Sequence, residues 1–416
     1  MKTRTKRILL FTLIVACLAA LVVFHSAAAY SDSPYYAQQE AAYFSNLQEY
    51  IEELPVKVVD HVVYLKANDG KSYTVISYFD TKEAMDTKRV VLQNEIDGIP
   101  VTRVQVGYDL GAEWDRMPPE ARKVKFLTIP SNITYLGRYT FTCLPSLKSH
   151  KLPLTVVALD GAFEALENLT QVSLPAGVKV IGDGTFSQCT NLAAIKINGK
   201  VETIGDNAFG ACKSLKKITL PDSVKTIGET AFTMSGLTKI QIPQSCTSIG
   251  DYAFNGCPLK YVTFSSVNHK KTVQIGEGAF QNCVNLKKVT FPENAKSVVL
   301  KNDAFNGCTA LKAIVNPQVV REIRLGAFKD CAALETVTIS SKIKQVAANA
   351  FEGCKNLKKV RLLTKKSAFL NSVYEEGNFT QNLPKACKVY VKTAAMKRAV
   401  ADAGCTNKVI VKADLK

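Results

Sequence analysis

Cysteine is the residue type in this sequence with the clearest capacity for chemistry, because thiols form disulfides, bind metals and act as nucleophiles. The chain has twelve cysteines, and most of them follow a phenylalanine at a constant distance. One cysteine, Cys143, lies two residues after a phenylalanine. Seven others lie three residues after a phenylalanine, namely Cys189, Cys212, Cys257, Cys283, Cys308, Cys331 and Cys354. Ser235 stands in the same place after Phe232, and Ala165 or Leu166 after Phe163. A position that accepts Cys, Ser or Ala is typical of a small buried packing site, which predicts reduced thiols.

Two other uses of these thiols stay open at the level of sequence. Many cysteines in a secreted protein favour a disulfide framework. Metal binding has less support, since no C-x-x-C pair or histidine cluster accompanies them. Cys387 and Cys405 lie outside the series and are candidates for a disulfide with each other.

Other catalytic signals are missing from the sequence. The four histidines, His25, His61, His150 and His269, have no nucleophile or metal-ligand partner at a recognisable spacing. There is no glycine-rich phosphate loop, nucleophile elbow or H-E-x-x-H motif, and acidic residues do not recur as a carboxylate pair. We therefore expect a protein that is not an enzyme, with no catalytic residue, cofactor or metal.

The phenylalanines themselves recur at intervals of 22 to 26 residues. They stand at Phe141, Phe163, Phe186, Phe209, Phe232, Phe254, Phe280, Phe305, Phe328 and Phe351. A near-constant period in this range predicts a solenoid, in which each repeat buries its apolar face against its neighbours.

One clean repeat shows the elements that must position these residues. Leu215-x-x-Ile218-x-Leu220 alternates inward and outward side chains and predicts a strand, which Pro221 ends. Val224-x-x-Ile227-Gly228 follows and predicts a second short extended stretch before Phe232.

The recurring pattern C-x-x-L-x-x-[IV]-x-[LIF]-P, then V-x-x-I-G-x-x-A-F, resembles the BspA-like leucine-rich repeat family of bacterial surface proteins over roughly residues 90–391. The resemblance implies a secreted or surface-displayed, non-enzymatic protein whose role is adhesion. The glycine of the pattern is replaced by Leu159, Lys301, Arg324 and Ala347 in four repeats, which argues against a strictly left-handed backbone there.

The expected fold is an α/β-type repeat solenoid, a leucine-rich repeat with one parallel strand per repeat of about 23 residues. We expect a signal peptide over 1–29, a helix and β-hairpin cap over 30–89, the solenoid over 90–391 and a helix–strand cap over 392–416. The pattern predicts strands at Lys57 to Lys66 and Ser72 to Phe79 around an Asp-Gly turn, and a last helix at Ala394 to Ala403 followed by a strand at Val409 to Val411.

The first 29 residues carry a basic start, an apolar core and small residues at Ala27 to Ala29, as a cleaved secretory signal does. Lipid attachment at Cys17 and an uncleaved anchor are the alternatives. No other segment has the roughly 20 apolar residues of a membrane helix, so the mature chain should be secreted or at the cell surface, without a transmembrane span.

The charge balance favours an anionic partner. Removing the four basic residues of the signal from a formal net charge of +17 leaves +13. The outward positions of the predicted strands carry eight charges, all basic, with two tyrosines among them; this candidate binding face consists of Lys151, Lys196, Lys217, Lys239, Tyr261, Lys288, Lys359, Arg361, Lys388 and Tyr390. Trp114, the only tryptophan, lies in an insertion over 107–122 and is a candidate loop contact.

Two classes of function remain. The first is an extracellular recognition module for a protein, a glycan or another polyanion. The second is a structural surface protein without a dedicated ligand, on which lysine and threonine are merely tolerated on a solvated strand face. Nucleic acid is not an expected partner, because aromatic residues are not interleaved with the basic ones.

Overall fold

In the computed structural model, the repeat phenylalanines form a buried spine. The structure describes residues 56–60, 62–78, 89–106, 126–141, 144, 147, 151–265, 271–315, 317–364, 379–380 and 382–415. The chain divides into two units, Met1–Leu147 and Lys148–Lys416. In the second unit the rings from Phe163 to Phe351 are buried and stacked, with neighbouring centroids 5.0 to 5.7 Å apart. This confirms the predicted stack and shows that one repeat makes one turn of a solenoid.

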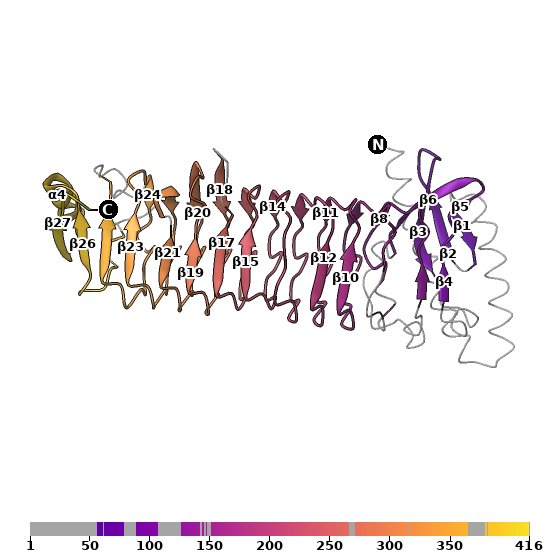
Figure 1. Ribbon diagram of the computed structural model, residues 1–416, viewed down its shortest axis with the longest axis horizontal. Helices are drawn as coiled ribbons and strands as arrows, with labels where there is room; N and C mark the ends of the chain where they lie inside the picture. Colours follow the sequence, from indigo (N-terminus) through magenta and orange to yellow (C-terminus); the bar gives the residue numbers. More distant parts are fainter. Residues whose placement is uncertain are drawn as a thin grey trace, which may run out of the picture. The chain divides into compact units, whose positions relative to one another are not determined.

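The second unit has two rows of short strands, which Figure 1 shows along its length. Strands from the L-x-x-[IV]-x-[LIF] segment form what we call the L row, and those from V-x-x-I form the V row. The V row is unbroken and parallel, in the order β9 (Ala158–Leu159), β11 (Val180–Ile181), β13 (Thr203–Ile204), β14 (Thr226–Ile227), β16 (Ser248–Ile249), β18 (Thr272–Ile275), β20 (Ser297–Leu300), β22 (Val320–Ile323) and β24 (Gln345–Val346).

The L row falls into three separate groups. They are β10 (Gln171–Leu174) with β12 (Ala194–Ile197); β15 (Lys239–Ile242), β17 (Tyr261–Phe264), β19 (Lys288–Thr290) and β21 (Ala313–Val315); and β23 (Thr336–Ile339), β25 (Lys359–Leu362), β26 (Lys388–Val391) and β27 (Lys408–Val411). The main sheet thus has one parallel strand per repeat, but this strand comes from the second short extended stretch and not from the L-x-x-[IV]-x-[LIF] segment. Most repeats contribute two strands, and the continuous sheet is the V row.

The interruptions of the L row coincide with weak apolar anchors. Residues 216–220, the segment chosen above as the clean example, form no strand, and Ile218 is only half-buried. After β21, whose Ile314 is also half-buried, the 3-10 turn η3 (Pro317–Val319) intervenes before β23. A strand whose central side chain is not fully buried gains less from packing against the spine, so its ladder is easier to lose.

The repeat glycine is required for close approach rather than for a left-handed backbone. Gly228, Gly250 and Gly276 do not have positive φ. A Cβ built at Gly250 would lie 2.5 Å from the carbonyl carbon of Gly228 in the preceding turn, and one at Gly276 would lie 2.5 Å from that of Gly250. These glycines let the turns stack at their observed spacing.

The first unit is built around a three-stranded antiparallel arrangement. β2 (Val62–Lys66) pairs with β3 (Tyr73–Tyr78), as the hairpin prediction requires. The run predicted as one strand from Lys57 is in fact two, because the chain turns at Asp60, where φ is +47°, so that β1 (Val56–Val59) pairs antiparallel with β2. The remaining strands of this unit are β4 (Arg89–Val91), β5 (Glu95–Ile96), β6 (Ile99–Val104), β7 (Phe126–Thr128) and β8 (Tyr135–Leu136).

The C-terminal helix and strand are present as predicted. The helix α4 (Ala394–Asp402) begins at Thr393, whose hydroxyl accepts a hydrogen bond from the Met396 amide. The strand β27 then pairs in parallel with β26 and so extends the L row. Because α4 is the only α-helix among the described residues, the α/β class is not confirmed and the unit is a parallel-strand solenoid. The predicted N-terminal helix lies outside the described residues.

Candidate functional site

The candidate face is the solvent side of the L row. On β15, β17, β19 and β21 the register aligns Lys239 with Tyr261, Tyr261 with Lys288 and Lys288 with Ala313. The side chains at the first three of these positions are exposed, while the alternate positions of the same strands are buried in β15 and β17. The strand alternation predicted from the sequence therefore holds, and it directs the basic side chains to solvent.

The ten predicted face residues are divided among the three L-row groups. Lys151 and Lys196 belong to the first group, where both lie beside Ser173. Lys217 lies in the segment without a strand. Lys239, Tyr261 and Lys288 belong to the second group, and the third contains Lys359, Arg361, Lys388 and Tyr390. The face is thus not one uninterrupted row.

Four lysines that the sequence analysis did not select complete these groups. Lys260, Lys287 and Lys312 each follow the repeat leucine, and all three are exposed. Backbone hydrogen bonds of 2.9 and 3.0 Å run from Lys287 to Lys260 and from Lys312 to Lys287, so the three stand on successive turns. Lys408 is the fourth, in register with Lys388. The sequence signal for the first three is a lysine directly after the repeat leucine.

None of these basic side chains forms an ion pair with another described residue. Within the described part of the chain, ion pairs engage other lysines, such as Lys225 with Glu202 and Lys358 with Glu335. Lys359, Lys388 and Lys408 occupy directly opposed positions on three adjacent strands. Like charges in such positions destabilise a sheet by about 0.2–1 kcal/mol per pair. The face therefore concentrates uncompensated positive charge.

Acidic side chains instead line the turn that follows the V row. The carboxylates of Asp183, Asp206 and Asp251 each accept a hydrogen bond of 2.7–2.8 Å from a backbone amide of the next turn. These contacts satisfy N–H groups that the short V-row strands leave unpaired. These three aspartates thus share one repeated structural role.

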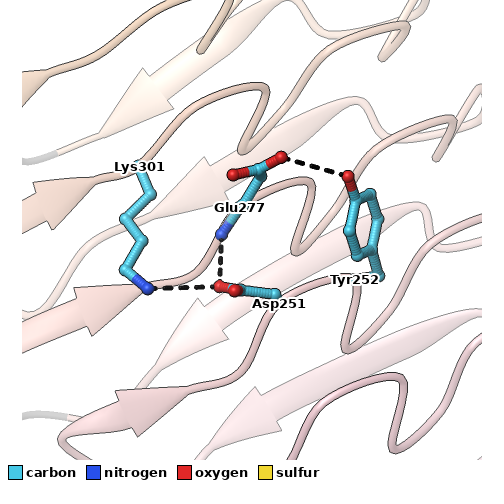
Figure 2. A network of polar contacts seen from close by, with 4 residues as sticks. All are labelled: Asp251, Tyr252, Glu277 and Lys301. Carbon is cyan, nitrogen blue, oxygen red and sulfur yellow. Dashed lines mark hydrogen bonds and ion pairs between the residues drawn. The ribbon is translucent and has the colours of Figure 1, made fainter.

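The row of carboxylates ends in a small polar network, shown in Figure 2. Lys301 replaces the repeat glycine, and its Nζ lies 3.2 Å from the Asp251 carboxylate two turns away. The Tyr252 hydroxyl donates to Glu277 at 3.2 Å; burial, together with this carboxylate, raises the pKa of Tyr252. The network gives a structural reason for Lys301.

The cysteine series is buried and unreactive in its geometry. The thiols are free, and each of the seven donates a hydrogen bond to the carbonyl of the phenylalanine one turn earlier, as Cys189 does to Phe163 at 2.9 Å and Cys308 to Phe280 at 3.2 Å. Burial raises the pKa of the Cys257 thiol to about 11 and that of Cys308 well above its usual value. The prediction of buried, reduced thiols is confirmed, and the hydroxyl of Ser235, at the same place in the series, lies 3.3 Å from the Cys257 Sγ. Cys387 and Cys405 are also free.

The described residues include no group of three or more His, Cys, Asp or Glu side chains arranged to hold a metal ion. Nor does any helix in these residues have the length and apolar character needed to cross a membrane. A small apolar crevice lies at the break between β21 and β23, lined by Ile314, Pro317, Val337 and neighbouring side chains. Trp114 lies outside the described residues.

A family model for the BspA-type leucine-rich repeat region matches residues 120–162, 159–273 and 273–388, with six copies. The chain belongs to the BspA-type leucine-rich repeat family. No curated protein matches the chain.

Two of the solved structures that resemble this BspA-type chain support its fold, those of a Bacteroides ovatus protein and of the pneumococcal antigen PcpA. A leucine-rich repeat protein from Bacteroides ovatus is 23% identical, with a TM-score of 0.51, and the match covers 86% of this chain and 99% of that one. The pneumococcal vaccine antigen PcpA is 19% identical, with a TM-score of 0.50 and the same two coverages. A leucine-rich cell surface protein from Faecalibacterium prausnitzii is 20% identical over 85% of this chain and 98% of that one, with a TM-score of 0.38.

Proposed function

We propose that this BspA-type protein is a secreted or surface-displayed, non-enzymatic recognition module that binds a polyanionic glycan or envelope polymer through its L-row face. The observation that carries the proposal is the register of unpaired basic residues on adjacent strands, above all Lys359, Lys388 and Lys408. Stacked like charges cost stability, so a binding role accounts for them better than tolerance on a solvated surface does.

The chemistry of the face fits a flexible anionic chain better than a small ligand. Its exposed ammonium and guanidinium groups stand on a flat sheet, where each attracts an anion but none is enclosed. Attraction of this kind is long-ranged, sums over many contacts and weakens as salt screens the charges. Threonines beside the lysines, such as Thr263 and Thr290, add hydroxyl groups on the same side of the sheet.

Retention on a dextran sulfate column tests the proposal. The face variant changes Lys217, Lys239, Lys288 and Arg361 to Glu. The control variant changes Lys200, Lys296, Lys342 and Lys344 to Glu, which alters the net charge equally at positions off the L-row strands. The two variants therefore differ in where charge is lost and not in how much.

Exposed ion pairs contribute about 0.2–1 kcal/mol each, so four lost contacts should weaken binding about tenfold or more. We expect the face variant to elute at much lower salt than the wild type and the control to elute near it. Equal elution of the two variants would reject the face and favour a structural surface protein without a dedicated ligand.

A further inference from the structure

From β15 onward, the basic residues of the L row fall into two clusters separated by a gap, in addition to Lys151, Lys196 and Lys217 earlier in the row. The first cluster is carried by or adjoins β15 to β21 and consists of Lys239, Lys260, Lys287, Lys288 and Lys312. The second is carried by β25 to β27 and consists of Lys359, Arg361, Lys388 and Lys408. Both lie on the same row of the same unit, so their separation follows from the strand order.

The gap between the clusters is the break in the L row. The outward positions there are Ala313 and Val315 on β21 and Thr336 and Thr338 on β23, none of which carries charge. The nearby Glu335 is paired with Lys358 at 3.2 Å. Between Lys312 beside β21 and Lys359 on β25, an anionic chain therefore passes one strand, β23, whose outward positions carry no basic group.

The dimensions of the clusters follow from the stacking. From β15 to β21 there are three strand steps, or about 14 Å at about 4.8 Å per step, and from β15 to β27 there are seven steps, or about 34 Å. The phenylalanine centroids, 5.0 to 5.7 Å apart, give a similar rise per turn. The lysines of each cluster align across the strands, so a bound chain must run along the solenoid axis.

We propose that the two clusters form one bivalent site for a linear polyanion that lies along the L row and covers both clusters in full when it is about 34 Å long. This inference rests on the proposed function, because it assumes that the face binds anions. A chain that engages the first cluster meets the second at a high effective concentration, since the two are fixed on one framework. Affinity should then rise sharply at the length that spans both, rather than in equal increments with each added charge.

Oligoglutamates of graded length provide the probe, because an extended peptide reaches at most about 3.3–3.6 Å per residue and charge repulsion keeps it extended. A peptide of four residues can cover about 14 Å and one of twelve about 40 Å. Binding to the full chain is measured by calorimetry at low salt, with oligoglutamine of equal length as the uncharged control. Polyphosphates graded to the same extended lengths show whether phosphate or carboxylate chemistry is preferred.

Two half-site variants make the test specific. Lys239→Glu with Lys288→Glu disables the first cluster, and Lys359→Glu with Lys388→Glu disables the second. We expect the twelve-residue peptide, which can cover both clusters in full, to bind the wild type at least tenfold more tightly than the four-residue peptide, which can cover only one cluster in full. Each half-site variant should lose that gain and still bind the four-residue peptide through its remaining cluster.

The outcomes separate the two proposals. Absence of binding by every anionic probe would overturn the proposed function itself. Binding that rises evenly with length, or a gain at twelve residues that survives in either half-site variant, would leave the basic face as a binding surface but overturn the bivalent site.

Discussion

The glycine that follows the V row offers the sharpest test of how the solenoid sets its spacing. At Gly250, a methyl group would lie 2.5 Å from a backbone carbon of the preceding turn, well inside any contact that real Cβ atoms make. The clash is with backbone on a packed neighbour, so it cannot be relieved by rotating a side chain. Overpacking of this kind costs about 1–3 kcal/mol.

Two of the natural exceptions to the glycine lie where the stack is wider. Between Phe254 and Phe280, where glycine is present on both turns, the ring centroids are 5.0 Å apart. The separation grows to 5.4 Å at the turn with Arg324 and to 5.7 Å at the turn with Ala347, although the turn with Lys301 keeps 5.1 Å. Gly250→Ala must therefore either widen the stack locally or strain the turn.

Chemical denaturation of the full chain, followed by circular dichroism, measures the effect. We expect Gly250→Ala to lower the free energy of unfolding by about 1–3 kcal/mol. The matched control is Ala347→Gly, made where the stack is already wide. It should lower the free energy of unfolding by no more than roughly 0.5–1 kcal/mol, the entropic cost of a glycine. If Gly250→Ala is as stable as the wild type, or no worse than Ala347→Gly, close approach does not explain the glycine.

The remaining predictions concern the thiols and the carboxylates. Burial raises the pKa of the Cys257 thiol to about 11, whereas the thiol in the unfolded chain has a pKa of about 8.5. The stability that this thiol contributes is therefore complete below the unfolded pKa and is lost as the pH rises toward 11. Cys257→Ser should reduce this alkaline loss of stability when unfolding is measured as a function of pH. The buried thiols should react with a maleimide only after unfolding, and rapid labelling of the native protein, read by mass spectrometry, would contradict the packing. Asp206→Ala should destabilise the chain by about 1 kcal/mol through loss of its 2.7 Å bond from the Glu229 amide, whereas Asp206→Asn, which keeps an acceptor, should cost less in thermal melts.

Sequence periodicity was sufficient to predict the solenoid, the phenylalanine spine and the buried cysteines, because each depends on a large or small apolar group recurring at a fixed interval. It did not predict that the continuous sheet is the V row. Two-residue strands such as Thr226–Ile227 carry too few alternating positions to stand out, and their pairing depends on neighbours one turn away.

The left-handed residues of the turns were also missed. Thr230, Met234 and Tyr252 all have φ between +51° and +57°, although none is a residue type that favours this region. Turn-to-turn hydrogen bonds hold them there, as when the Tyr252 amide donates to the Glu277 carbonyl at 2.7 Å. Local composition gives no signal for a conformation that the neighbouring turn imposes.

Part of the candidate face could be predicted, because strand alternation identifies which side chains point to solvent. The division into clusters could not, since it arises where half-buried Ile218 and Ile314 fail to hold the L row together. The place of Lys408 beside Lys388 could not be predicted either, because β26 and β27 are separated in the sequence by α4 and their pairing is a long-range contact.

Lysine footprinting tests the central claim most directly. The protein is treated with an amine-reactive reagent, with and without saturating dextran sulfate, and the modified lysines are identified by mass spectrometry. If the L-row face binds the polymer, Lys239, Lys288, Lys359 and Lys388 should be protected, while Lys200, Lys296 and Lys344 react as before. Uniform protection of both sets, or protection of the second set alone, would contradict the account.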